Sequence, residues 1–339
     1  MKPAPSAIRR PTIKEVAKLA GVSFKTVARV VNQEPSVKPE MREAVLRAMK
    51  MLNYSPNISA RQLRSDRSFL IAMLFDIAVD YLARAQAGAI ARCRAAGYHL
   101  IVEEARRGAE VEVAERLKAL KVDGVILTPP VSQRETLREA LRERGLRYVL
   151  ISPEEGEHAA PSVSMDDRRA AQEMTEHLIG LGHRDIAFIS GGERRASRER
   201  RAGYLAALET ARIAPRPELQ AVGDFLFRSG ESAARELLKL PRRPTAIFAA
   251  NDGMALGAMV AAARLGVSVP QELSVAGFDD SPTAQVVWPQ LTTIRQPLAD
   301  MSAAAVDLLL QREEPESPAS VLLDFQLVKR DSVGPVPAA

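Results

Sequence analysis

The alternation of hydrophobic and polar positions divides the chain into three sections. Residues 1–56 carry short helical patterns without strand-like runs, and residues 57–67, NISARQLRSDR, form a polar connector without glycine or proline. From residue 68 onward, apolar runs of strand length alternate with amphipathic helical stretches, for example 113–120 and 170–181. The predicted strands are FLIAMLF (69–75), HLIVEE (99–104), GVILT (124–128), RYVLIS (147–152), DIAFISG (185–191), TAIFAAND (245–252) and LSVAGFDD (273–280).

This alternation predicts parallel sheets joined by right-handed crossovers. Residues 68–332 are many for one hydrophobic core, so we predict two α/β lobes. The expected N-lobe spans about 68–167 plus 297–322, and the expected C-lobe spans about 168–292 plus 323–332. The predicted domains are therefore a helical unit (1–56), a connector (57–67) and a two-lobed core (68–332).

The segment TIKEVAKLAGVSFKTVARVVNQ (12–33) has the pattern of a helix-turn-helix. Thr12 is a good N-cap, and Glu15 three residues later completes a capping box. Gly21 follows where the turn needs a positive φ, and Ser23 can cap the second helix. The first helix is expected to bury Val16, Ala17 and Leu19.

One face of the second helix is suited to the major groove of DNA. At about 100° per residue, Phe24, Lys25, Ala28 and Arg29 share this face. Arg29 can bridge guanine O6 and N7, Lys25 can donate to guanine or phosphate, and Phe24 can touch a thymine methyl. The alternative is an ordinary helical hairpin with solvated charges. A third helix is predicted over residues 39–51, and its Arg42 and Arg47 are expected to contact the DNA backbone. The predicted core of this unit also includes Val27, Val30, Val31, Val45, Leu46, Met49 and Leu52.

Charge separates the two ends of the chain. Residues 1–68 hold 14 Lys and Arg against 5 acidic residues, a net +9, whereas the remainder holds 33 basic and 37 acidic residues, a net −4. A basic module most often meets phosphate, in nucleic acid or on a membrane surface. Cys93 is the only cysteine, and no apolar run approaches the ~20 residues of a membrane span. The N-terminus lacks the apolar core of a signal peptide, so we expect a cytoplasmic protein.

The segment 12–32, followed by LNYSPNISARQLRS (52–65), resembles the headpiece and hinge of the LacI/GalR family of bacterial repressors. The resemblance continues through ANDGMALG (250–257), SVAGFDD (274–280), LTTIRQP (291–297) and LVKRDS (327–332). It implies a helix-turn-helix headpiece followed by an α/β core of two parallel-sheet lobes, similar to periplasmic sugar-binding proteins. Ala28 stands where the family commonly has serine, so one hydroxyl contact to phosphate is missing. The implied DNA-binding residues are Thr12, Ser23, Phe24, Lys25, Thr26, Arg29, Asn32, Asn57, Ala60, Leu63 and Arg64.

The sequence of the connector (57–67) predicts a conformational switch between an unfolded and a helical segment. Asn57 can cap a helix of about eight residues, which is marginal in water unless something packs against it. The resemblance implies that two such helices, one per subunit, lie side by side in the minor groove, where Leu63 wedges into a base step and small Ala60 allows close approach. Folding of the connector then depends on the spacing of the two cores. A ligand that prefers one spacing would change the grip on the operator.

Polar residues follow the predicted strands of the core, and ligands of open parallel sheets bind beyond these carboxyl ends. The candidates found in this way are Asp76, Ser152, Asn251, Asp252, Asp279 and Asp280. The resemblance adds Arg200 and Gln296, Phe225 as an aromatic that stacks on the ligand, and Tyr81 and Leu82 at the aromatic pair of the family's NPFF motif, where this chain reads AVDYLA. Arginine, carboxylate and carboxamide together suit the hydroxyls of a sugar.

Several of these residues also have purely structural interpretations. Asp252 can cap the helix that follows it, and Asp280 can cap the turn before Pro282. Phe278 and Trp288 can belong to the core or to a dimer interface. His183, before a predicted strand, is expected to be structural.

Three rival functions remain to be weighed. An enzyme would need a nucleophile–base pair, a P-loop or a metal-ligand cluster, none of which the motifs provide. A transport receptor would need an export signal and would have no use for residues 12–64. A purine corepressor in place of a sugar inducer stays open, although few aromatic residues are available to face a base. We therefore expect a homodimeric repressor of a pseudopalindromic operator, controlled by a mono- or disaccharide, with no cofactor, metal or membrane partner.

Overall fold

The computed structural model describes residues 11–31, 36–54, 67–76, 80–154, 160–311 and 318–336. It divides into two compact units, Met1–Phe69 and Leu70–Ala339.

The first unit contains the predicted helix-turn-helix and a third helix: α1 (Ile13–Ala20), α2 (Phe24–Val31) and α3 (Pro39–Met51). The capping box at the start of α1 is confirmed, because the Glu15 carboxylate accepts from the Thr12 backbone N–H at 2.6 Å while the Thr12 hydroxyl accepts from the Glu15 N–H. Gly21 has a φ of +66° and ends the helix. The Ser23 hydroxyl accepts from the Thr26 N–H at 3.1 Å, as expected of a cap for α2.

The small core of this unit is made largely of valine. Val16, Val27 and Val45 are fully buried, and Ala17, Val30 and Ala48 pack around them. The prediction that Leu19 and Leu46 belong to this core is wrong, because Leu19 is 46% exposed and Leu46 is 52% exposed. Each lies about 100° around its helix from the middle of the buried stripe, and three short helices bury only one narrow stripe each.

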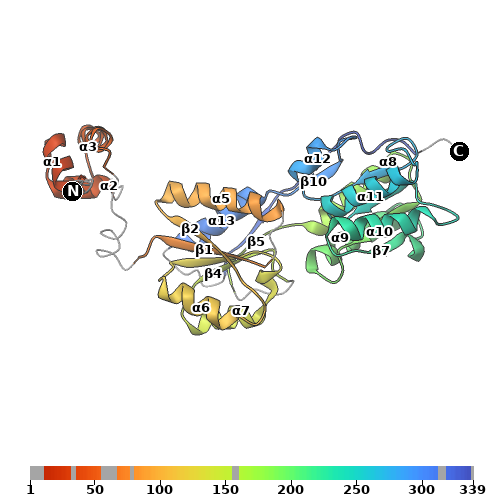
Figure 1. Cartoon of the computed structure of the whole chain (residues 1–339), viewed down its shortest axis with the longest axis horizontal. Helices are drawn as coiled ribbons and strands as arrows, with labels where there is room; N and C mark the ends of the chain where they lie inside the picture. Colours follow the sequence, from red (N-terminus) through yellow and green to blue (C-terminus); the bar gives the residue numbers. More distant parts are fainter. Residues whose placement is uncertain are drawn as a thin grey trace, which may run out of the picture. The chain divides into compact units, whose positions relative to one another are not determined.

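The N-lobe of the second unit is built on a six-stranded parallel sheet in the order β11-β5-β4-β3-β1-β2. Helices α5 (Asp80–Ala96) and α13 (Leu298–Leu310) cover one face, and α6 (Glu110–Ala119) and α7 (Glu135–Glu143) cover the other (Figure 1). A 3-10 turn, η1 (Val131–Gln133), follows β3. The strands are β1 (Leu70–Phe75), β2 (His99–Glu104), β3 (Gly124–Leu127), β4 (Tyr148–Ile151), β5 (Ser162–Met165) and β11 (Ser320–Leu323).

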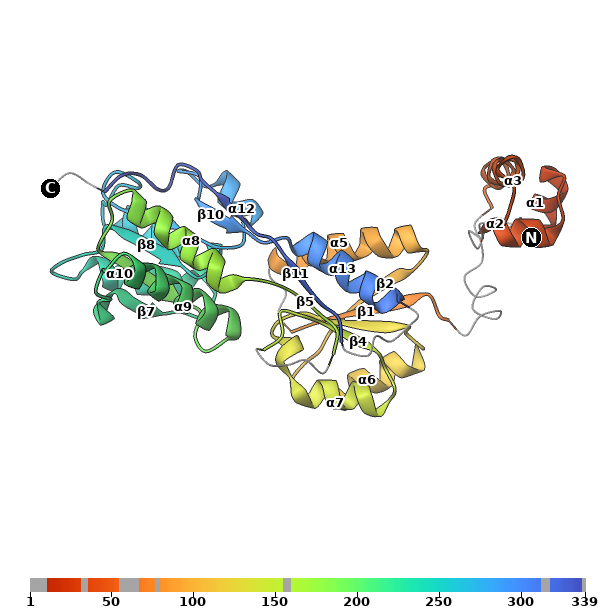
Figure 2. The same ribbon diagram turned by 180° about the vertical axis from the view of Figure 1, so that it is seen from behind.

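The C-lobe has a four-stranded parallel sheet in the order β7-β6-β8-β9. Helix α8 packs with α9 (Figure 2), and α10 packs with α11. Right-handed crossovers place α9 on the opposite face from α10 and α11. The elements are β6 (Ile186–Ser190), β7 (Gln220–Val222), β8 (Ala246–Ala249), β9 (Ser274–Ala276), α8 (Asp167–Gly180), α9 (Arg195–Thr210), α10 (Phe227–Leu238), α11 (Asp252–Arg264), α12 (Pro282–Val286) and the turn η2 (Pro217–Leu219).

The chain passes between the lobes three times: from β5 to α8, from β10 (Thr293–Arg295) to α13, and from β11 to β12 (Gln326–Val328). Strands β10 and β12 pair antiparallel beside the C-lobe. All seven predicted strands are present, and all but β2 are shorter than predicted, by one to five residues in total. The pattern missed β5, β7, β10, β11 and β12, because these strands are short and each of them contains at least one polar residue in place of a continuous apolar run.

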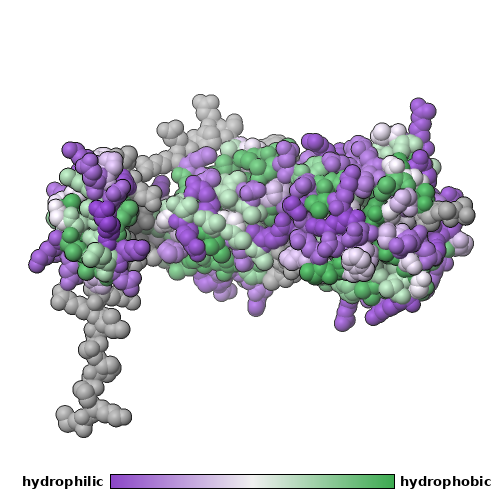
Figure 3. Space-filling model, turned by 90° about the horizontal axis from the view of Figure 1, so that it is seen from above, coloured by the Kyte–Doolittle hydropathy of each residue, from purple (hydrophilic) through white to green (hydrophobic). Residues whose placement is uncertain are grey.

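Each lobe has its own buried core. Phe278 and His183 are fully buried in the C-lobe, whereas Trp288 is 83% exposed and is therefore not part of the core of this chain. The His183 ring is hydrogen-bonded to the Thr245 hydroxyl at 2.9 Å and to the Gly334 carbonyl at 3.0 Å, which agrees with its expected structural role. On the face seen in Figure 3, apolar side chains are interspersed among polar ones.

Candidate DNA-reading helix and effector cavity

Helix α2 has the two faces that its sequence predicts. Val27 and Val30 are buried, while Phe24 is 48% exposed and Lys25 and Arg29 are also exposed. An exposed aromatic ring next to two cations is costly to leave in water and suits a groove that offers both methyl groups and acceptors. The arrangement can therefore present side chains to base edges.

Three other predicted DNA contacts take part in capping. The hydroxyls of Ser23 and Thr26 are hydrogen-bonded to each other at 2.9 Å, and the Thr12 hydroxyl bonds Glu15. These residues therefore place the amino ends of α1 and α2, where N–H groups favour a phosphate. The remaining candidates, Asn32, Asn57, Ala60, Leu63 and Arg64, lie outside the described residues.

A cavity of about 470 Å³ lies between the two lobes of the core, within the size range of small-molecule sites. The N-lobe contributes the ends of β3 and β4 and the start of α5, and the C-lobe contributes the ends of β7, β8 and β9 and the starts of α8, α9 and α11. This is the strand-end location expected for an open parallel sheet. Its lining is Tyr81, Pro129, Pro130, Gln133, Ser152, Asp167, Arg194, Ala196, Arg200, Asp224, Phe225, Leu226, Asn251, Asp252, Gly253, Leu256, Asp279, Ser281, Thr283 and Gln296.

Arg200 is fixed in the cavity wall. Its Nε donates to an Asp167 oxygen at 2.9 Å, its Nη1 donates to the Ala250 carbonyl at 2.6 Å, and its guanidinium lies 3.6 Å from the centre of the Phe278 ring. Arg195 also pairs with Asp167, at 3.2 Å. Asp167 was not predicted as a site residue, although its position at the start of α8, directly after a strand, is the kind of signal that identified the others.

Asp279 faces the cavity from the end of β9. Gln296, at the crossover to α13, donates to its Oδ1, and Arg200 lies 3.7 Å from the same oxygen. Burial raises the pKa of Asp279 to about 6, although Arg200 and Gln296 oppose the rise. From α5 of the N-lobe, Arg84 donates to the backbone carbonyls of Asp279 and Asp280 at 2.7 and 2.8 Å. Arg84 was not predicted, and it ties the N-lobe directly to the strand end that carries the Asp279 carboxylate.

The helix that follows β8 is capped by Asn251 and not by Asp252. The Asn251 Oδ1 accepts from the Met254 N–H, and its Nδ2 donates to the Phe225 carbonyl, both at 3.0 Å. Asp252 is buried inside the first turn of α11 and accepts from the Ser281 N–H at 2.7 Å and from a hydroxyl of β10 at 2.6 Å. Burial and the neighbouring Asp279 raise its pKa to about 7.

Two aromatic side chains, one from each lobe, contribute to the apolar part of the cavity lining. The Phe225 ring packs so closely on Gly191 that a Cβ there would lie 2.1 Å from it, and the Arg194 guanidinium lies 5.3 Å from its centre. Tyr81 lines the cavity from α5 of the N-lobe. Its hydroxyl is buried and has no hydrogen-bond partner in the part of the chain that the structure describes. Burial also raises the pKa of Tyr81, so its hydroxyl remains a donor.

Backbone strain gathers around the cavity. Ser152, Phe225 and Asp279 line it with φ of +48°, +71° and +123°, and Asp280 beside it has +54°. Non-glycine residues in this region cost of the order of 1–3 kcal/mol each and persist where the surroundings hold them in place. Such clustering is typical of ligand sites.

Two residues that were predicted to contact the ligand do not line the cavity, and one residue that was predicted to cap a turn does not cap it. Asp76 pairs with Arg134 in a neighbouring hollow, and Leu82 is buried away from the cavity lining. Asp280 does not cap the turn before Pro282, because its carboxylate pairs with Arg295 and Arg330. The predicted residues that line the cavity together are Tyr81, Ser152, Arg200, Phe225, Asn251, Asp279 and Gln296.

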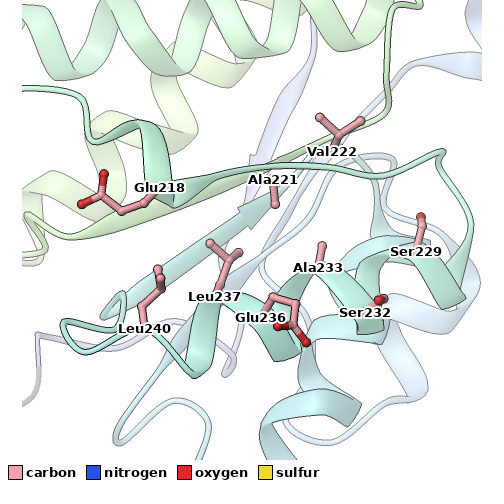
Figure 4. A pocket seen from close by; sticks show the side chains of 9 residues that line it. All are labelled: Glu218, Ala221, Val222, Ser229, Ser232, Ala233, Glu236, Leu237 and Leu240. Carbon is pink, nitrogen blue, oxygen red and sulfur yellow. The ribbon is translucent and has the colours of Figure 1, made fainter.

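A second hollow, of about 570 Å³, lies on the C-lobe between β7 and α10 (Figure 4). Val222, Leu237 and Leu240 supply apolar surface there, and Glu218 and Glu236 stand among its polar residues. It lacks the converging buried polar groups of the interlobe cavity. The interlobe cavity is therefore the better effector site.

A core of two parallel-sheet lobes around a polar cavity, joined in one chain to a helix-turn-helix, defines a ligand-controlled DNA-binding regulator. Residues 12–57 match the family of bacterial regulatory proteins, lacI family, and residues 175–333 match the periplasmic binding protein-like domain. The probable HTH-type transcriptional repressor ExuR of Bacillus subtilis (strain 168) is 33% identical over 331 residues, which cover 95% of this chain and 98% of that relative.

Solved structures give the same result. The complex of the transcriptional regulator CelR with cellobiose is 34% identical with a TM-score of 0.73, and covers 95% of this chain and 100% of its own. The lac repressor dimer bound to operator and the anti-inducer ONPF is 31% identical with a TM-score of 0.75, and covers 96% and 100%. The chain belongs to the LacI family and is a DNA-binding transcriptional repressor. Family membership therefore decides against the rival interpretation of the chain as an enzyme.

Among the described residues, no helix combines the length and the apolar character needed to cross a bilayer. The same residues contain no cluster of His, Cys, Asp and Glu suited to a metal ion.

Proposed function

We propose that this repressor controls carbohydrate-utilisation genes and leaves its operator when a mono- or disaccharide binds between the lobes. The observation that carries the proposal is the combination of polar and apolar groups in the cavity. Asp279 and Gln296 offer acceptors and donors to the cavity, and the Phe225 ring offers it an apolar face. A sugar has hydroxyl edges and apolar C–H faces, so it uses both.

The switch that we propose acts through the connector. Two hinge helices, carrying Ala60 and Leu63, would form in the minor groove only while the two cores of a dimer hold the right spacing. A ligand that shifts the lobes changes that spacing and melts the hinge. Coupling of about 1–3 kcal/mol changes operator affinity by about 5–150-fold.

A thermal-shift screen of mono- and disaccharides on the full chain tests the effector class, because a ligand of the folded state raises its stability by mass action. We expect at least one sugar to raise Tm and to weaken operator binding in an anisotropy titration. A sugar that raises Tm and tightens operator binding would be a corepressor and not an inducer. No response to any sugar would contradict the proposal.

A purine or another non-sugar corepressor is the second candidate. It is favoured by the presence of two aromatic side chains in the cavity lining, Tyr81 from the N-lobe and Phe225 from the C-lobe, because a flat base can stack on such rings. Hypoxanthine, guanine and adenine therefore belong in the same screen. A Tm rise with a purine alone would select this candidate.

We further propose a cytoplasmic homodimer with a headpiece (1–56), a hinge (57–67) and a core (68–332), reading a pseudopalindromic operator through two copies of Phe24, Lys25 and Arg29. Exposed Val286 and Trp288, at the end of α12 and two residues beyond it, support a dimer contact there, because neighbouring exposed apolar side chains are typical of protein–protein contacts. Sedimentation of the wild type and of Trp288→Glu tests the contact. A wild-type monomer would contradict it.

A further inference from the structure

The interlobe cavity carries more negative than positive side chains. Four aspartates line it, Asp167, Asp224, Asp252 and Asp279, against two arginines. Asp252 is buried, Asp279 is half-buried with Arg200 no closer than 3.7 Å to its carboxylate, and desolvation raises the pKa of both. A site that already disfavours its own carboxylates has little capacity to hold another negative charge.

Both lining arginines are engaged by the protein. Arg200 uses its Nε and Nη2 on Asp167 and its Nη1 on the Ala250 carbonyl, and the same Nη1 lies 3.7 Å from an Asp279 oxygen, so two carboxylates already share its charge. Arg194 is exposed at the cavity mouth and lies over the Phe225 ring. It also faces Asp224, whose pKa is lowered first by the Ser229 hydrogen bond and further by Arg194. A carboxylate would therefore have to break an existing pair to be neutralised.

The polar atoms that remain are suited to hydroxyl groups. The Asp279 carboxylate has one oxygen taken by Gln296, and its second oxygen can accept from a ligand O–H. The Tyr81 hydroxyl is buried without a partner among the described residues, and as a donor it can meet a ligand oxygen. A hydroxyl satisfies both groups because it donates and accepts, whereas a carboxylate only accepts and would meet Asp279 as a like charge.

We propose that the effector is an uncharged polyhydroxyl compound and that this cavity rejects the corresponding sugar acids. The inference rests on the proposed function, since it names the charge class of the ligand in the same cavity. Asp279 and Tyr81 anchor the ligand hydroxyls, and the Asp167–Arg200 pair stands behind them as a neutral wall. Asp224 at the mouth adds one more negative charge, which Arg194 offsets only in part, against an incoming anion.

The test compares matched ligand pairs on the full chain by thermal shift and calorimetry: glucose with glucuronate, galactose with galacturonate, and cellobiose with cellobionate. Asp224→Asn removes one negative charge at the mouth, and its amide oxygen can still accept from the Leu226 N–H. Asp300→Asn on the exposed surface of α13 is the matched control. The expected result is that a neutral member binds and its acid binds at least about tenfold more weakly. Asp224→Asn should narrow that ratio about threefold, and Asp300→Asn should leave it unchanged.

The outcomes separate the two proposals. An acid that binds as tightly as its neutral partner, or more tightly, overturns the charge inference and leaves a sugar-responsive repressor. If the ratio of the affinities for a neutral sugar and its acid is the same in Asp224→Asn as in the wild type, the role given to Asp224 is wrong. If neither member of any pair binds, the sugar effector fails, and the inference fails with it.

Discussion

The pair of Arg200 and Asp167 should be a large single contribution to the stability of the core. Both side chains are almost fully buried, and Arg200 also holds the Ala250 carbonyl. Arg200→Met would leave Asp167 with only Arg195 as a charged partner and the carbonyl unpaired. Breaking a buried pair by removing one partner costs about 3–5 kcal/mol. For a core of this size, that corresponds to a fall in Tm of about 6–20 °C.

The matched control is Arg201→Met, one residue further along the same helix. Arg201 is exposed and donates to the Gln220 side-chain oxygen at 2.6 and 2.9 Å, so its loss should change the free energy of unfolding by less than about 0.5 kcal/mol. Urea unfolding followed by far-UV circular dichroism compares the two variants. The double variant Arg200→Met, Asp167→Asn should recover part of the loss, because the Asp167 charge is then no longer buried without Arg200. Equal losses for Arg200→Met and Arg201→Met would refute the assignment of Arg200 to a buried ion pair.

Three further predictions concern DNA reading, pH and the link between lobes. Arg29→Ala should cost about 1–3 kcal/mol on operator DNA and less on random DNA in anisotropy titrations; equal losses would argue against base reading. Since burial raises the pKa of Asp252 to about 7, the folded chain keeps a proton that an unfolded aspartate releases near pH 4. The free energy of unfolding should therefore fall as pH rises from about 4 to about 7, and Asp252→Asn should flatten this fall; an unchanged slope would contradict it. Arg84→Met removes two hydrogen bonds from the N-lobe to C-lobe carbonyls and should weaken effector binding about tenfold in calorimetry, whereas Arg94→Met on the exposed side of the same helix should not.

Local signals in the sequence were enough for the fold. The capping box at Thr12, the positive φ of Gly21 and the apolar strand runs are each set by a few neighbouring residues, so they could be read without tertiary information. The strands that the sequence did not reveal, such as β5 and β11, are short and are stabilised mainly by pairing with each other across the chain. Leu19 was misplaced because hydrophobicity alone does not say how wide the buried stripe of a short helix is.

The candidate cavity could be predicted only in part. Residues at strand ends, such as Ser152 and Asp279, were found because parallel strands bring their carboxyl ends together. Asp167 was missed because the strand before it, β5, was not predicted, and Arg84 was missed because its contacts depend on how the lobes close on one another. The capping role of Asn251 and the burial of Asp252 depend on which of two adjacent side chains turns inward, and sequence spacing does not decide this.

The threefold passage of the chain between the lobes has a consequence for synthesis on the ribosome. Strand β11 pairs with β5, and Ser320 at its start lies beside Ser162, so β5, which is an inner strand of the finished sheet, is an unpaired edge strand until almost the whole chain has emerged. An open parallel edge invites pairing with other chains. A nascent chain truncated before residue 320 should therefore aggregate, even though the first five strands of that sheet are already present.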